Sequence, residues 1–103
     1  MSVYVDKAAY PHGNMIMCHM IADTLTELHS MADALGLKRE YFQPRSFPHY
    51  DLAKSKRAAA VAFGAIEVTR AELVGHMKRL RPSLAVEFAA ALNANVKREA
   101  PTP

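Results

Sequence analysis

Residues 49–64 read HYDLAKSKRAAAVAFG, and the interpretation of the whole chain depends on this stretch. Asp51 is a good N-cap residue, so the stretch predicts a helix that begins immediately after it. Gly64 ends that helix, because glycine readily adopts the left-handed conformation that follows a helix C-terminus. His49 and Tyr50 would then precede the helix, at a position where an imidazole can act on a ligand as acid or base.

Upstream of this stretch, the sequence predicts two strands and a helix. Val3-Tyr4-Val5 is a short β-prone run, and the apolar run at residues 15–20 is typical of a buried strand. Thr24 and Glu27 form a capping box that opens a helix. Gly36 ends this helix, which is the best defined in the chain.

The remaining segments continue the alternation. Residues 39–43 and 65–68 are predicted strands, and Thr69 with Glu72 forms a second capping box that opens a helix. Pro82 is predicted to start a separate last helix, since proline is favoured at the first helical position.

This order of elements predicts a small α/β domain over residues 1–81, with a mostly parallel sheet of three to four strands and crossover helices. Residues 82–103 are expected to form a C-terminal helix with a frayed tail from Lys97 onward. Phe88 and Leu92 on that helix suggest self-association into a homo-oligomer.

Composition restricts the class of protein. The chain has 103 residues, half of them hydrophobic, and a formal charge of +3, which fits one globular domain with an anionic partner. No apolar run approaches the roughly 18 residues of a membrane span. Cys18 is the only cysteine, so no internal disulfide can form. Because the N-terminus shows no secretory pattern, we expect a cytoplasmic protein without a membrane partner.

Polar residues should meet at one edge of the predicted sheet, because ligands of open α/β sheets bind outside the carboxyl ends of the strands. The residues placed there by the predicted topology are Asp6, His19, Asp23, Arg45, His49, Tyr50 and Asp51.

Three roles are open for the acidic and histidine residues: metal binding, a structural role and acid–base catalysis. Asp6, His19 and Asp23 could bind a divalent metal, with His49 or Asp51 completing the ligand set. Alternatively, His19 is a buried side chain that binds backbone, and Asp23 supports the N-terminus of the helix that follows. For catalysis, the candidate acid and base residues are His19, His49 and Asp51.

Lys54, Lys56 and Arg57 place three cations near a helix N-terminus, which is already positive. Such a region attracts an anion, and a guanidinium can hold phosphate with two hydrogen bonds. Tyr50 and Arg45 would complete this ligand-binding set. The alternative is a solvated basic face.

These patterns lead to hypotheses from three classes. The first is a protein that binds a phosphate-bearing small ligand, specifically a nucleotide, at the helix near Asp51. The second is a small metal-dependent phosphoester hydrolase or nuclease that uses the His and Asp residues of the same edge. The third is a protein interaction module.

The chain also resembles a family of small bacterial and phage proteins catalogued as domain of unknown function 4031. The resemblance covers about residues 2–80 and rests on five pieces: Val3-Tyr4-Val5-Asp6, residues 18–23 (CHMIAD), Glu27-Leu28-His29 with Ala32 and Gly36, His49-Tyr50-Asp51 with Lys56-Arg57, and Gly64-Ala65. It implies that His19, Asp23, His49, Asp51 and Arg57 belong to the family pattern. It implies no activity, and the segment after Pro82 lies outside it.

Overall fold

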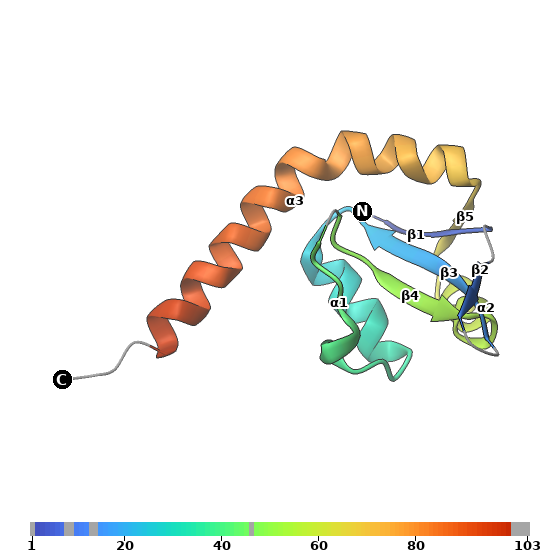
Figure 1. Ribbon diagram of the computed structural model, residues 1–103, viewed down its shortest axis with the longest axis horizontal. Helices are drawn as coiled ribbons and strands as arrows, with labels where there is room; N and C mark the ends of the chain where they lie inside the picture. The colour runs from blue at the N-terminus through green and yellow to red at the C-terminus, as the bar shows by residue number, and fades with distance from the viewer. Residues whose placement is uncertain (1, 8–9, 13–14, 46, 100–103) are drawn as a thin grey trace.

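The computed structural model describes residues 2–7, 10–12, 15–45 and 47–99, which form a five-stranded sheet and three α-helices (Figure 1). The strands are β1 (Val3–Asp6), β2 (Tyr10–His12), β3 (Met15–Ala22), β4 (Tyr50–Ala53) and β5 (Ile66–Val68). The helices are α1 (Leu25–Ala34), α2 (Lys54–Ala62) and α3 (Arg70–Glu99), with a 3-10 turn, η1 (Arg39–Tyr41), after α1. The predicted small α/β fold with a C-terminal helix is confirmed.

The sheet is mixed, so the prediction of a mostly parallel sheet is wrong. β3 pairs antiparallel with β1, β2 and β4, whereas β1 and β5 are parallel. Met17 pairs with both β2 and β4, and Met20 pairs with both β1 and β4. Therefore β1 and β2 lie end to end on one side of β3, and β4 lies on its other side. The prediction failed because α1 connects β3 to β4, which run in opposite directions, so α1 is not a crossover between parallel strands.

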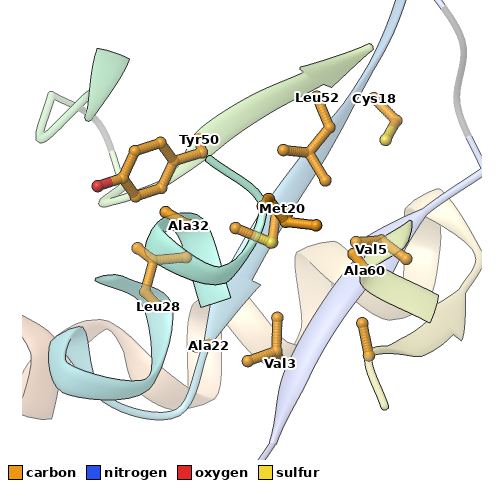
Figure 2. Close-up of a cluster of buried hydrophobic side chains, with 12 residues drawn as sticks. Val3, Val5, Cys18, Met20, Ala22, Leu28, Ala32, Tyr50, Leu52 and Ala60 are labelled. Carbon is orange, nitrogen blue, oxygen red and sulfur yellow. The ribbon is translucent and has the colours of Figure 1, made fainter. Parts of the chain in front are cut away.

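The alternation of side chains along the strands builds two cores, one on each face of the sheet. Figure 2 shows the first core, in which Val5 of β1, Met20 of β3 and Leu52 of β4 are buried together with Ala60 of α2 and residues of α1. The second core lies on the opposite face under α3, and its buried members are Tyr4, Ile21, Leu25, Phe47, Val68, Leu73, Leu80 and Leu84.

The predicted capping box of Thr69 and Glu72 is complete, and that of Thr24 and Glu27 is formed in part, because Glu27 Oε1 accepts from the Thr24 hydroxyl and not from its backbone N–H. Thr24 Oγ1 accepts a hydrogen bond from the Glu27 amide at 3.1 Å. Thr69 and Glu72 bond reciprocally, since each backbone N–H donates to the other residue's side chain. Gly36 follows α1 with a φ of 75°, as predicted for a glycine that ends a helix.

The prediction that Asp51 caps a helix is wrong. Asp51 lies inside β4, where it pairs with His19 of β3, and α2 begins only at Lys54. Residues 39–43 were expected to form a strand, but they contain η1 and one isolated bridge from Gln43 to His49. The Asp51 prediction failed because the hydrogen bonds that define β4 come from β3, which is remote in sequence, so local residues do not reveal this strand.

Pro82 does not start a separate helix, because α3 runs without interruption from Arg70 to Glu99. Pro82 has no N–H to donate and its ring crowds the Lys78 carbonyl, which accounts for the bend of α3 in Figure 1. Leu84 lies beyond the predicted boundary at residue 81 and is still buried in the second core. The C-terminal half of α3 then leads away from the sheet (Figure 1).

The predicted frayed tail begins at Lys97, but α3 extends to Glu99, and residues 100–103 lie outside the described residues. Within the described ranges, no helix combines the length and the hydropathy required for a membrane span.

Candidate functional site

The candidate site is built around Asp6, a fully buried carboxylate at the end of β1. Asp6 Oδ1 accepts a hydrogen bond from the backbone N–H of His19 at 2.8 Å, and Oδ2 lies 2.9 Å from His19 Nδ1. Aspartate is almost never fully buried unless it is paired, so these two contacts explain how the fold accommodates the charge. They also fix the orientation of the His19 ring.

A second histidine and carboxylate lie beside the first pair: His49 directly precedes the neighbouring strand β4, and Asp51 lies within it. His49 Nε2 is 3.3 Å from Asp51 Oδ1, and His49 Nδ1 is 2.6 Å from the carbonyl oxygen of Phe47. Asp51 Oδ2 accepts a hydrogen bond from Gln43 at 2.7 Å. Because His19 and Asp51 are direct partners across β3 and β4, the two imidazole rings approach edge to face, with centroids 5.8 Å apart.

Both histidines line a cavity of about 200 Å³ under the N-terminal part of α3, hereafter the imidazole cavity. Its lining residues are Asp6, His19, Ile21, Phe47, His49, Arg70, Leu73, Val74 and Met77. Its walls are therefore mostly apolar, and its polar lining residues are Asp6, His19, His49 and Arg70. The volume is below the roughly 300 Å³ at which small-molecule sites usually begin, so the cavity fits one part of a ligand.

The predicted basic residues do not join this cavity. They belong to α2, which covers the opposite face of the sheet. Arg57 Nε donates to the backbone carbonyl of Asp6 at 2.8 Å, and its Nη1 donates to Glu67 at 3.0 Å. Lys56 Nζ donates to the Leu35 carbonyl at 2.6 Å, so it stabilises the C-terminus of α1.

Lys54 and Arg57 instead line a second cavity of about 420 Å³, hereafter the basic cavity. Its lining residues are Lys7, Ile16, Met17, Cys18, Leu52, Lys54, Arg57, Ala58 and Glu67. Burial and the nearby Asp6 carboxylate raise the pKa of Cys18 to about 11, so its thiol stays protonated at neutral pH. Cys18 is therefore a small buried residue of the first core.

Asp23 lies apart from Asp6 and His19, although all three were predicted to bind metal together. Its carboxylate accepts hydrogen bonds from the Ser2 amide at 2.9 Å and the Tyr4 hydroxyl at 3.0 Å, beside Arg79. Asp23 follows His19 by four residues of extended chain, so the Cα atoms of the two residues are about 13 Å apart. Within the described ranges, no three His, Cys, Asp or Glu side chains are arranged to hold a metal ion.

The two other predicted ligand-binding residues also lie elsewhere. Tyr50 is buried in the first core, and its hydroxyl is 2.7 Å from His29 Nδ1. Burial raises the pKa of Tyr50 and lowers the pKa of His29, so both groups are neutral at pH 7. Arg45 is exposed in the loop before β4 and is not part of either cavity lining.

Sequence reasoning missed two cations, Arg70 of the imidazole cavity and Lys7 of the basic cavity. Each lies just after a strand: Lys7 directly follows β1, and Arg70, the first residue of α3, comes two residues after the end of β5. Applying the carboxyl-edge rule to every strand would have included both.

The fold and the site define a small mixed α/β protein with an Asp–His pair beside a second histidine. The chain belongs to the family described as "Protein of unknown function (DUF4031)", whose family model matches residues 3–80. This match confirms the resemblance found in the sequence. The searches matched no curated protein and no solved structure.

Proposed function

We propose that the protein cleaves a phosphate ester by general acid–base catalysis in the imidazole cavity. One observation carries this proposal: a fully buried carboxylate holds His19, and a second imidazole with its own carboxylate faces the same cavity. Histidine is the side chain best suited to move protons near neutral pH. A pair of histidines can therefore supply both the base and the acid that an ester cleavage needs.

His19 has the geometry of a general base. Its Nδ1 donates to the Asp6 carboxylate, which can only accept, so Nε2 is the nitrogen that exchanges protons with a substrate. When His19 takes a proton from the attacking water or hydroxyl group, the imidazolium remains paired with Asp6. A buried aspartate has the same orienting role in hydrolytic triads.

His49 is the second proton carrier. The Phe47 carbonyl can only accept, so it fixes a proton on Nδ1. A second proton on Nε2 forms an ion pair with Asp51, and a substrate oxygen in the cavity can compete with Asp51 for that proton. In this way His49 can donate to the leaving oxygen, which then departs without a full negative charge.

Arg70 supplies the contact for the phosphate. It is the first residue of α3, at the positive end of that helix dipole, and it lines the imidazole cavity. Because the cavity is small and mostly apolar, we infer a substrate larger than the cavity, with the reacting phosphodiester at the histidines. A nucleic acid or a nucleotide phosphodiester has this chemistry.

Binding of a phosphate ligand without turnover is the second candidate function, and the basic cavity favours it because Lys7, Lys54 and Arg57 line this cavity.

Self-association through the C-terminal half of α3 stays a prediction. It is consistent with Leu92, whose side chain is 52% exposed.

The test is turnover of bis(p-nitrophenyl) phosphate and of fluorogenic RNA and DNA oligonucleotides by the purified protein. His19→Asn and His49→Asn should each lower turnover by about 100-fold or more, the usual contribution of a positioned proton carrier. His76→Gln is the matched control, because His76 stacks on Tyr4 outside the imidazole cavity. Parallel assays with chelator and with added Mg²⁺ or Mn²⁺ test the metal-dependent form of the reaction. Equal turnover by wild type and His19→Asn would overturn the proposal.

A further inference from the structure

We propose that the basic cavity is a separate binding site for a nucleoside monophosphate, on the face of the sheet opposite the imidazole cavity. The proposal does not depend on catalysis at His19. It rests on where three cations lie, on how one of them is held, and on the apolar wall beside them.

The cations of the basic cavity come from two segments, the residue after β1 and the start of α2, which converge at the carboxyl ends of strands that run in the same direction. Lys7 follows β1, Lys54 opens α2 directly after β4, and Arg57 lies one turn further along α2. The carboxyl ends of strands are the usual ligand position in α/β sheets, because the first turns of helices and loops meet there. Lys7, Lys54 and Arg57 therefore lie at the carboxyl ends of the strands, where a phosphate group is expected to bind.

The balance of charge in the basic cavity favours an anion. Glu67 is the only acidic residue among its lining residues, and it is already paired with Arg57 at 3.0 Å. Lys7 and Lys54 are both exposed, and they line the cavity together with this ion pair. An incoming phosphate would therefore meet a net positive surface, which strengthens anion binding.

Arg57 is held in place before any ligand arrives. Its Nε donates to the Asp6 carbonyl and its Nη1 donates to Glu67, which use two of the roughly five donors of a guanidinium. A pre-oriented guanidinium loses little conformational entropy when it binds phosphate. The N-cap of α2 is Ala53, which provides no side-chain acceptor, so the first amides of α2 can also donate to an anion.

The remaining wall of the basic cavity is apolar and suits the other half of a nucleotide. Ile16, Met17, Leu52 and Ala58 line it, and a planar base can pack against such a surface. The volume of about 420 Å³ falls in the range of ordinary small-molecule sites, roughly 300–1,000 Å³. The basic cavity therefore offers cations to bind the phosphate of a nucleotide and aliphatic side chains to pack against its base.

The closing experiment is a titration of the full-length, ¹⁵N-labelled protein with adenosine monophosphate, adenosine and inorganic phosphate, followed by NMR. Adenosine monophosphate should shift the amides of Lys7 and of the first turn of α2, and it should bind more tightly than adenosine or phosphate alone. Lys54→Ala and Lys7→Ala should each raise the dissociation constant by about tenfold, the effect of losing one charged hydrogen bond.

Lys78→Ala is the matched control, since Lys78 is exposed on α3 outside both cavity linings. It should leave the dissociation constant unchanged, and circular dichroism should show that all three variants are folded. Two results would overturn the proposal: no saturable binding of adenosine monophosphate, or shifts centred on His19 and His49 that persist in Lys54→Ala. The second result would place the nucleotide in the imidazole cavity.

Discussion

Asp6 contacts His19 twice, through a backbone hydrogen bond of 2.8 Å and a side-chain contact of 2.9 Å to Nδ1. The first contact satisfies a backbone donor at the point where β1 ends beside β3, and the second orients an imidazole toward the imidazole cavity. One buried carboxylate therefore serves both the sheet and the candidate site. A substitution of Asp6 therefore tests its contribution to folding, and a substitution of His19 tests its contribution to chemistry.

The first prediction concerns the stability of this pair. Asp6→Ala should lower the free energy of unfolding by about 2–3 kcal/mol, because it leaves the buried His19 amide without its acceptor. Urea denaturation measures the change. Asp33→Ala removes an exposed carboxylate paired with Arg39 at 3.2 Å, and it should cost no more than about 0.5 kcal/mol. Equal losses in the two variants would contradict a special role for Asp6.

The second prediction separates two lysines that the sequence placed together. Lys56→Ala should destabilise the protein by about 1.5 kcal/mol, because Lys56 Nζ donates to the Leu35 carbonyl at the C-terminal end of α1. Lys54→Ala, at an exposed side chain of the same helix, should change stability by less than about 0.5 kcal/mol. Thermal unfolding of both variants gives the comparison, and similar melting temperatures would argue against the structural role of Lys56.

The third prediction tests whether the part of α3 beyond Pro82 is docked on the domain. Glu87 Oε1 accepts a hydrogen bond from the Leu25 amide at 2.6 Å, so α3 supplies an acceptor for the first residue of α1. Glu87→Ala should cost about 1 kcal/mol and accelerate hydrogen exchange in the first turn of α1. Glu40→Ala, a change at an exposed glutamate, is the control. Unchanged exchange in α1 would mean that this contact contributes nothing.

The fourth prediction concerns pH. Burial lowers the pKa of His29 below its ordinary value of 6.5, so the unfolded chain takes up a proton more readily than the folded one. Stability should therefore fall as pH drops through about 6.5, and this loss should level off once pH is below the lowered pKa.

His29→Gln should remove this part of the acid sensitivity, whereas His76→Gln should retain it. Urea unfolding at about pH 7.5 and at about pH 5 measures the difference. A wild-type-like loss of stability in His29→Gln would show that other groups cause it.

Features set by neighbouring residues were predicted well. The capping box of Thr24 and Glu27, the left-handed Gly36 and the buried run that became β3 depend on contacts within a few positions. The interpretation of Asp51 as an N-cap failed because a strand residue and a helix cap look alike when the partner strand is unknown. The prediction at Pro82 failed for a related reason: burial of Leu80 before the proline, and of Leu84 with the Glu87 contact after it, stabilises α3 on both sides of the bend.

The sequence by itself determined β1, the buried run of β3, β5, the capping residues of α1 and α3 and the set of candidate polar residues, since each follows from local pattern and residue type. Only the tertiary structure decided which of those residues meet. Period-two alternation in β1, β3 and β4 places Asp6, His19 and Asp51 on the face under α3. The basic residues of α2 lie on the other face, because that helix packs against Cys18 and Leu52. The pairing of β3 with both β1 and β4 sets this division, and long-range hydrogen bonds define that pairing.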